Sequence, residues 1–409
     1  MLEFSFLLSY SIEHHIGINM TRTHTFLIFF SIVIVLYGLI NSYIYLRGLQ
    51  AIPSGTTLRH WFNAVFWFLA LSYFAARLLE RFTVSWFTDG LVWIGSFWLG
   101  AMAYFVIILL VIDVLRLANY IIPFFPAIIT QNYQYAKQIT VLAVISIVLL
   151  VVIGARLNQM SPQIKTLELT IYKKSPLKEL QIVMVSDVHL GTIICHSHFM
   201  RIVEKINSLN PDIVLFAGDL VDEDIEPVIR QNLGETLRQV HSKYGIYGIT
   251  GNHEYIGGVE AACKYLTDHG VVMLRDSAVQ IADAFTLVGR EDISIRQFGG
   301  GKRKLLSELM GTVNKSLPVI LMDHQPLHLN EAVEQGADLQ FSGHTHNGQL
   351  WPFNYISDAV YELGWGYKQK GNTHFYVSCG VGTWGPPMRT GNRPEVVNVK
   401  LKFENDSAD

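Results

Sequence analysis

Hydrophobic residues follow two different patterns along this chain. Up to about residue 157 they form long uncharged runs, and from about residue 179 onward they form short runs that end in polar residues. A helix needs about 20 apolar residues to cross a bilayer. The long runs therefore predict four transmembrane helices, and their uncharged cores are 23–46, 61–76, 90–112 and 138–155.

Two of the apolar segments depart from this simple pattern. The run 61–76 is short, but it is rich in Trp and Phe, and Arg59 and Arg77 can extend from its two ends to the headgroups. The stretch 117–136 is also uncharged, but it contains Pro123 and Pro126. We expect that stretch to form an interfacial hairpin or a re-entrant segment, and a fifth span is the alternative.

Charge separates the same two regions. Only 16% of the chain is charged, against about 25% in ordinary soluble domains, and the charged residues fall mostly after residue 160. That second region is acidic overall, so no nucleic-acid-binding surface is expected. The three cysteines are too few for a disulfide framework or a cysteine metal site.

Polar residues follow five short β-rich runs in the second region. Ligands bind at the carboxyl ends of strands in α/β folds, because the loops at those ends converge. Further strands are predicted over 285–288, 374–378 and 395–403, and a helix with one apolar face over 198–210. The five runs are 180–186, 213–217, 245–250, 318–322 and 337–341, and the residues that follow them are Asp187, His189, Asp219, Asn252, His324, His344 and His346.

These seven side chains are all oxygen or nitrogen donors, and none is a cysteine. One tetrahedral site needs four ligands, so seven are too many for it. Two five- or six-coordinate cations that share one carboxylate, with water in the remaining positions, fit the number well. A mixture of carboxylate and imidazole ligands suits Mn, Fe or Zn, whereas Ca or Mg would take oxygen almost throughout.

The motifs D-x-H, G-D-x-x-D, G-N-H-E, a lone His after a strand and G-H-x-H occur in this order over about residues 179–402. Together they resemble the calcineurin-like metallophosphoesterase superfamily. Gly348-Gln349 and the stretch 380–389 are similar, more narrowly, to its membrane-associated bacterial branch. The resemblance implies an α/β fold, a two-sheet β-sandwich flanked by helices, preceded here by an all-α transmembrane region.

The resemblance also implies a role for each motif residue. One divalent cation would be held by Asp187, His189 and His346, and a second by Asn252, His324 and His344. Asp219 would bridge the two cations, with Mn favoured over Fe and Zn. His253 would bind no metal but would face the phosphate as the catalytic residue, where it would protonate the leaving group or stabilise charge.

Four further residues near the motifs have less specific expectations. Asp222 is expected to orient a ligand or the loop, with a plain loop cap as the alternative. Glu254 is expected to be a helix-start carboxylate rather than a catalyst. Asp323 would brace His324 or cap the turn, and Arg389 would contact substrate phosphate or form a surface salt bridge.

The apolar runs and the motifs together divide the chain into five successive segments. We expect an N-terminal tail (1–22), a membrane domain (23–157), a connector with the first strand (158–178), a metallophosphoesterase domain (179–404) and a C-terminal tail (405–409). The protein would sit in the cell membrane as a multi-pass protein. Four basic residues flank the predicted helices on each side, so the positive-inside rule favours neither orientation.

The function expected from these features is hydrolysis of a phosphodiester or pyrophosphate bond by water activated between two metals. Anchoring in a bilayer favours a lipid-linked or envelope substrate. One alternative is an anchored phosphodiesterase for a soluble nucleotide-type substrate, and another is a non-catalytic membrane sensor or scaffold. A transporter is disfavoured, because the spans hold few ionisable residues beyond Asp113 and Arg116.

Overall fold

The computed structural model of the chain describes residues 22–80 and 82–404, which form two compact units. The helical unit comprises residues up to Tyr73 together with Ala101–Leu150, and the sandwich unit comprises Phe74–Gly100 and the chain from Val151 onward. The predicted tails 1–22 and 405–409 lie outside the described residues, except that the first described helix begins at Arg22.

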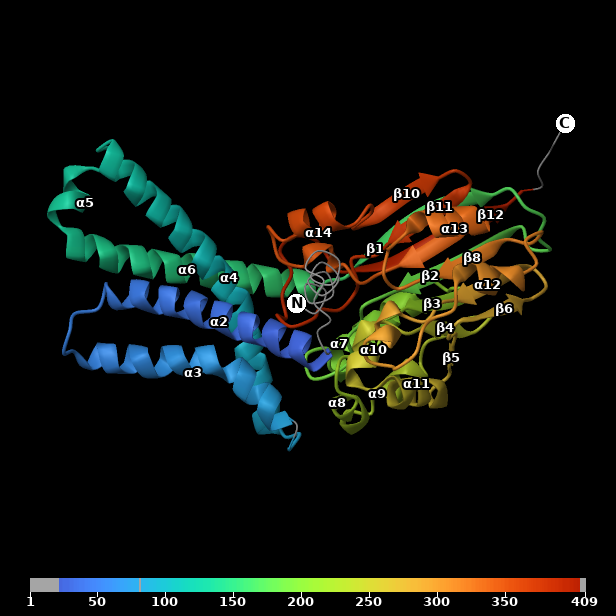
Figure 1. Cartoon of the computed structure of the whole chain (residues 1–409), viewed down its shortest axis with the longest axis horizontal. Coiled ribbons are helices and arrows are strands. Elements are labelled where there is room, and N and C mark those ends of the chain that lie inside the picture. Colours follow the sequence, from blue (N-terminus) through green and yellow to red (C-terminus); the bar gives the residue numbers. More distant parts are fainter. Residues whose placement is uncertain (1–21, 81, 405–409) are drawn as a thin grey trace. The chain divides into compact units, whose positions relative to one another are not determined.

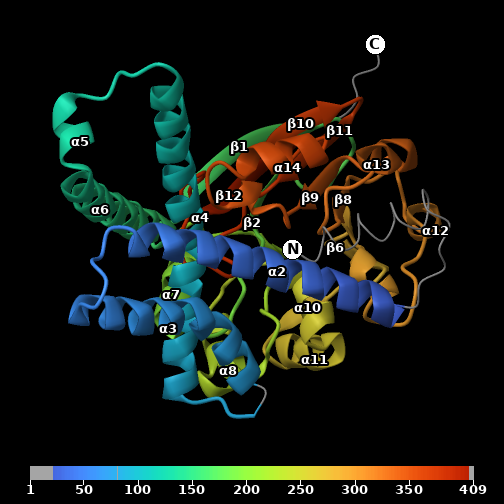
Figure 2. The same ribbon diagram turned by 60° about the vertical axis from the view of Figure 1, so that its left-hand side comes forward.

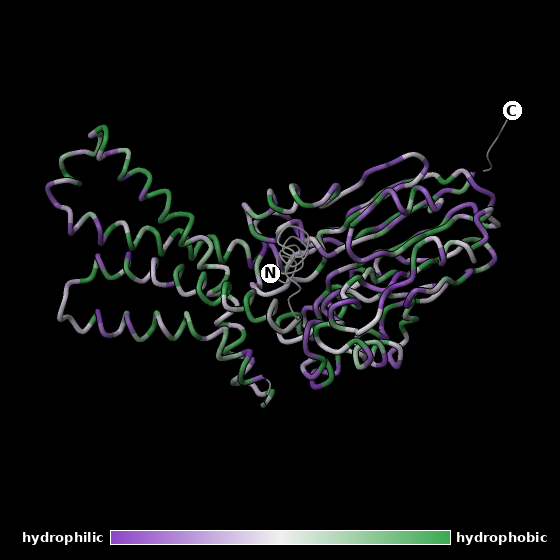
Figure 3. The backbone as a smooth tube through the Cα atoms, in the orientation of Figure 1, coloured by the Kyte–Doolittle hydropathy of each residue, from purple (hydrophilic) through white to green (hydrophobic). Residues whose placement is uncertain are grey.

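Four long helices follow the four apolar runs, and each is long and apolar enough to cross a membrane (Figure 1). The prediction of an apolar helical region is therefore confirmed. Hydrophobic residues run along most of the length of these helices (Figure 3), because a helix in lipid has no face that must remain polar. The helices are α2 (Arg22–Leu49), α3 (Thr57–Glu80), α4 (Trp86–Ile121) and α6 (Tyr133–Gln159).

The proline-containing stretch between α4 and α6 forms a hairpin with one short helix, α5 (Ala127–Gln131) (Figure 2). Asn119, near the end of α4, accepts hydrogen bonds through Oδ1 from the backbone N–H groups of Phe124 (2.8 Å) and Phe125 (2.6 Å). These bonds satisfy backbone donors where proline prevents the helix from continuing. The segment is therefore a hairpin and not a fifth long helix.

The sandwich unit contains two sheets of six strands each. The order in the first sheet is β1 (Gln163–Ile171), β12 (Glu395–Phe403), β2 (Glu179–Val185), β3 (Ile213–Ala217), β4 (Ile246–Ile249) and β5 (Val271–Met273). The order in the second sheet is β10 (Gly366–Lys370), β11 (Thr373–Val377), β9 (Leu339–Ser342), β8 (Val319–Met322), β7 (Phe285–Gly289) and β6 (Ser277–Ile281).

The strands that precede the motifs are parallel to their neighbours. Strands β2, β3, β4 and β5 pair in parallel in the first sheet, with Ile182 opposite Ile213 and Val214 opposite Ile246. Strands β7, β8 and β9 pair in parallel in the second sheet. Parallel neighbours end at the same edge of a sheet, so the loops after β2, β3 and β4 emerge together, and so do those after β8 and β9.

Alternating side chains on the strands build three hydrophobic cores. On β2, Ile182 and Met184 pack between the two sheets, whereas Val183 and Val185 pack against helices on the outer face. This alternation is expected because side chains of a strand point to opposite faces in turn. The predicted two-sheet sandwich flanked by helices is thus confirmed.

Helices cover the outer faces of both sheets (Figure 1). The first sheet is covered by α7 (His196–Asn207), α9 (Leu233–Leu237) and α11 (Val259–Asp268), and the second by α12 (Leu306–Gly311) and α13 (Leu329–Gln335). The other short helices lie in loops: α8 (Glu226–Arg230), α10 (Asn252–Gly257) and α14 (Asn354–Val360), with two 3₁₀ turns, η1 (Ile293–Arg296) and η2 (His346–Gly348).

Candidate metal centre

The motif side chains meet where five strands end. Asp187, Asp219 and Asn252 follow β2, β3 and β4 of the first sheet, and His324 and His344 follow β8 and β9 of the second. Three groups of side chains could each hold a metal ion, because within each group the ligand atoms lie within 4.8 Å of one another. The first is Asp187, His189 and His346, the second is Asp219, His324 and His344, and the third joins His189 and Asp219 to His253, which was not predicted to be a ligand.

Asp219 belongs to the second group and also lies close to the first. Its Oδ2 is 3.1 Å from Nε2 of His324 and 3.9 Å from Nε2 of His189. Its Oδ1 accepts a hydrogen bond from the backbone N–H of His253 (2.9 Å). A single carboxylate thus faces one imidazole from each group, which is the position that a bridging ligand requires.

The backbone at the ligands is in an unusual conformation. Five of them have φ between 47° and 73°, the left-handed region that non-glycine residues rarely adopt: Asp187, His189, Asp219, His344 and His346. Each such residue costs on the order of 1–3 kcal/mol, and such residues concentrate at functional sites. The loops therefore hold the ligands in place at the expense of local stability.

Glycines next to the ligands let the loops approach closely. A Cβ added at Gly251, which precedes Asn252, would lie 2.1 Å from Oδ1 of Asp219. A Cβ added at Gly343 would lie 2.3 Å from Oδ2 of Asp187. The backbone of Gly251 itself has φ of −111°, so space, and not conformation, requires glycine there.

Burial and charge act in opposite directions on the ligands. Burial alone would raise the pKa of Asp219, but the nearby imidazoles of His324 and His253 outweigh it and hold that pKa well below its usual range. Burial would lower the pKa of His324, but the Asp219 carboxylate holds it well above its usual value. The pKa of His346 is well below its usual value because of its burial and the adjacent His189 and Arg389 charges.

Asp222 lies beside two imidazoles at the site. Its Oδ1 lies 3.0 Å from Nδ1 of His253 and 3.6 Å from Nδ1 of His189. Despite burial, which raises it, the pKa of Asp222 is lowered by these two histidines. Burial lowers the pKa of His253, but Asp219 and Asp222 raise it to about 9. Both contacts are close but lack hydrogen-bond geometry, so the expectation that Asp222 orients a ligand stays a prediction.

Glu254 ties two ligand loops together. Its side chain is buried and accepts hydrogen bonds from the backbone N–H groups of Gly251 (2.7 Å), Asp219 (3.2 Å) and Val221 (2.9 Å). The residue does start a helix, α10, as expected. Because it also binds the loop after β3, it fixes Asp219 relative to Asn252.

The donor set fits divalent cations. Oδ2 of Asp187 and Oδ1 of Asn252 are buried and have no hydrogen-bond partner, which is costly unless another ligand satisfies them. Nε2 of His324 is close to Asp219 but lacks hydrogen-bond geometry. These oxygens and this imidazole nitrogen have lone pairs that no protein hydrogen bond uses. Such a mixture of oxygen and nitrogen ligands suits divalent transition-metal cations.

His346 fits this set less closely than the other ligands do. Its Nδ1 lies 3.0 Å from a guanidinium nitrogen of Arg389, and its Nε2 lies 3.0 Å from Nε2 of His189. Arginine can only donate, so Nδ1 accepts and the ring proton lies on Nε2. A cation can take Nε2 only after that proton moves, which requires Arg389 to shift.

Two expectations about neighbouring residues are wrong. Arg389 is fully buried, and it donates to the carbonyl oxygens of Cys379 (2.7 Å) and Gly382 (2.6 Å), so it forms no surface salt bridge and is not exposed to a substrate. Asp323 does not brace His324. It pairs instead with Arg290 (2.8 Å) and Arg303 (3.0 Å), while Nδ1 of His324 lies 2.7 Å from the carbonyl oxygen of Ala217.

The chain is similar to known phosphoesterases. Residues 180–348 match the calcineurin-like phosphoesterase family. A transmembrane protein with metallophosphoesterase domain from Danio rerio is 33% identical over 64% of this chain and 62% of its own length. Uncharacterized metallophosphoesterases from Aquifex aeolicus and Campylobacter jejuni are 32% and 28% identical, over 55% and 92% of this chain and 85% and 99% of theirs.

These relatives differ in how much of their length the chain covers. It spans just under two thirds of the first curated relatives, 62% for Danio rerio and 65% for Helicobacter pylori. Because relatives occur in both bacteria and animals, the resemblance extends beyond a bacterial branch.

The close approach at Gly251 yields a test that replaces none of the predicted ligand residues. Gly251→Ala should push the Asp219 carboxylate out of position and lower the content of bound Mn²⁺ measured by mass spectrometry after dialysis. The matched control is Gly311→Ala, because a Cβ there meets no atom within 4 Å. Circular dichroism would verify the fold of both variants. Equal Mn²⁺ content in the two would show that the position of Asp219 does not govern metal binding.

Proposed function

We propose that this chain, which belongs to the calcineurin-like phosphoesterase family, is a membrane-anchored hydrolase of phosphoric esters that depends on two divalent cations. One observation carries the proposal: the Asp219 carboxylate lies close to histidines of two groups of side chains that could each hold a metal ion, at the ends of parallel strands. A ligand set that is complete and mostly buried disfavours a non-catalytic sensor or scaffold, because buried unpaired acids and imidazoles are costly to keep without a use.

In this proposal Asp187, His189 and His346 hold one cation, Asn252, His324 and His344 hold the other, and Asp219 binds both. When bound, the two cations would supply an acidified water nucleophile and would neutralise charge on the phosphoryl group. Mn²⁺ is favoured, with Fe and Zn as alternatives, because the ligands mix carboxylate with imidazole.

His253 is the proposed catalytic side chain of the protein itself. Its Nδ1 faces Asp222, which leaves Nε2 as the nitrogen that reaches the substrate. The imidazole is packed edge-to-face against His189 and Trp384, at ring-centroid distances of 4.5 and 5.7 Å. The contacts hold the ring in one orientation. From there it can donate a proton to the leaving oxygen or stabilise charge on the phosphoryl group.

The substrate that we propose is a phosphodiester or a pyrophosphate. The four apolar helices would span the bilayer and anchor the enzyme in the cell membrane as a multi-pass protein. A lipid-linked substrate is therefore favoured. A soluble nucleotide-type substrate is the second candidate. The two are distinguished by comparing hydrolysis of a diester in mixed lipid micelles with hydrolysis of the same headgroup diester free in solution.

The full-length protein in detergent micelles, supplied with Mn²⁺, should hydrolyse bis(4-nitrophenyl) phosphate. Excess EDTA followed by dialysis should abolish the activity, and added Mn²⁺ should restore it, because the nucleophile and the charge clamp both depend on the cations. Release of nitrophenolate is followed by absorbance. Undiminished turnover after EDTA treatment would contradict the proposed mechanism.

His253→Ala should leave metal content and thermal stability near those of the wild type but lower turnover by on the order of 10²- to 10⁴-fold, the usual worth of general acid catalysis. The loss should be larger for alkyl phosphodiesters than for nitrophenyl diesters, because nitrophenolate leaves without needing a proton.

Two results would reassign His253. Loss of a metal ion in His253→Ala would make the residue a ligand. An equal loss of turnover with both leaving groups would indicate charge stabilisation and not proton donation. The variant His241→Ala, at an exposed histidine that belongs to none of the motifs, serves as the control and should behave like the wild type.

A further inference from the structure

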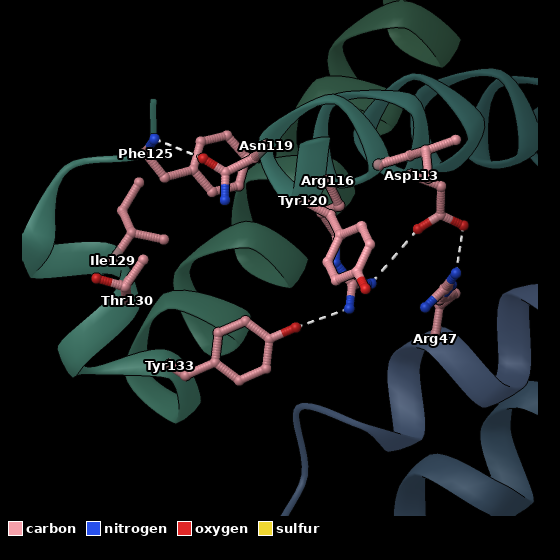
Figure 4. A pocket seen from close by; sticks show the side chains of 10 residues that line it. Arg47, Asp113, Arg116, Asn119, Tyr120, Phe125, Ile129, Thr130 and Tyr133 are labelled. Carbon is pink, nitrogen blue, oxygen red and sulfur yellow. Dashed lines mark hydrogen bonds and ion pairs between the residues drawn. The ribbon is translucent and has the colours of Figure 1, made fainter. Parts of the chain in front are cut away.

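A cavity of about 490 Å³ lies within the helical unit, where its helices end. Its walls come from the last turns of α2 and α4, from the hairpin with α5, and from the start of α6 (Figure 4). None of the metal-centre residues belongs to this unit. The cavity therefore shares no residue with the proposed catalytic site, and the proposed catalysis does not explain it.

Positive charge dominates this end of the helical unit. Asp113 is the only acidic residue in the described stretches 22–73 and 101–150. Four basic residues lie near the same helix ends: Arg47, Arg59, Arg116 and Lys137. One carboxylate cannot neutralise four cations, and uncompensated charge at a membrane surface attracts anionic lipid.

Asp113 aligns the two arginines that line the cavity (Figure 4). Its Oδ2 accepts from Arg47 and from the hydroxyl of Tyr43 (2.7 Å), and its Oδ1 lies 3.4 Å from a guanidinium nitrogen of Arg116. Arg116 also donates to the hydroxyl of Tyr133 (2.7 Å). A guanidinium has five N–H groups, more than these contacts use, so both arginines keep donors for a ligand.

The rest of the cavity wall mixes polar side chains (Asn119, Thr130) and tyrosines (Tyr120, Tyr133) with apolar ones. The apolar ones are Leu117, Phe125 and Ile129, and Phe125 and Ile129 are half-buried. Beside the cavity the hairpin exposes large hydrophobic side chains, with Ile122 70% and Ile128 72% exposed. Exposed apolar side chains beside helices long enough to span a membrane suit contact with lipid, so the cavity combines phosphate donors with surroundings suited to acyl chains.

We propose that this cavity binds the phosphate headgroup of an anionic phospholipid. The guanidinium groups of Arg47 and Arg116 bind the phosphate oxygens, since the planar fork of arginine matches phosphate in a bidentate way. The glycerol and the upper acyl chains lie against Leu117, Phe125 and Ile129. The inference depends on the proposal that the helices span a bilayer, but not on the proposed catalysis.

Free inorganic phosphate offers the same oxygens to the arginines but has nothing to place against the apolar side chains of the wall. A lipid is therefore favoured over phosphate from solution. The helix ends also fall where a bilayer places its headgroups: α2 ends at Leu49, α4 ends at Ile121 and α6 begins at Tyr133.

The test titrates the full-length protein in neutral detergent micelles with phosphatidylglycerol and, separately, with phosphatidylcholine of the same chains, and native mass spectrometry counts the bound lipid. The wild type should bind phosphatidylglycerol more tightly. Arg116→Gln should weaken that binding by about tenfold, the equivalent of one charge-assisted hydrogen bond. The control Arg59→Gln removes an equal charge at the same helix ends but outside this cavity, and it should weaken binding by no more than about fivefold, the equivalent of about 1 kcal/mol for one basic residue near a membrane surface.

Three results would overturn the inference: equal affinity for the two lipids, equal effects of Arg116→Gln and Arg59→Gln, or displacement of the lipid by millimolar inorganic phosphate. If Arg116→Gln is not monodisperse on size exclusion, Arg116→Lys replaces it, because lysine keeps the charge beside Asp113 but not the planar fork. Arg116→Lys should still weaken phosphatidylglycerol binding, and wild-type affinity would contradict the proposal. Diester hydrolysis in micelles should be unchanged in these variants, so failure here is distinct from failure of the proposed catalysis.

Discussion

The buried carboxylate of Asp219 is the group around which the sandwich unit is arranged. An isolated buried charge is costly, and here the histidines of both sheets lie close enough to offset that cost. The loops that carry these groups must also approach very closely, so glycine stands at Gly251 and Gly343, and Glu254 binds the backbone on both sides of the gap. Left-handed backbone at the ligands is the cost of this convergence.

Much of this arrangement could be predicted from the sequence. Short apolar runs followed by Asp, Asn or His identified the strands that end at the site, and the structure has strands at each of those runs. The length and lack of charge of the first region predicted the apolar helices. Both kinds of prediction rest on local patterns, since burial on two faces of a strand or on all faces of a helix leaves a clear hydrophobic signal. That these side chains bind metal stays a prediction.

The features that the sequence did not predict depend on tertiary contacts. Strand β10 has the polar sequence GYKQK, and β5 is apolar but only three residues long, so neither carries a hydrophobic run long enough to recognise as a strand. Arg389 gave no sign that carbonyl oxygens and His346 would surround it in the core. In the helical unit, Asp113 and Arg47 are 66 residues apart, and only the packing of α2 against α4 brings them together beside a cavity. Charge pairs of this kind become visible only when the fold is known.

The most direct test of the account is anomalous diffraction at the manganese edge from crystals of the full-length protein grown with Mn²⁺. The account predicts two anomalous peaks about 3.5–4 Å apart, one on each side of the Asp219 carboxylate, with Asp187 and His189 at one peak and Asn252 and His324 at the other. A single peak, or two peaks that do not share Asp219, would contradict a bridged two-metal centre.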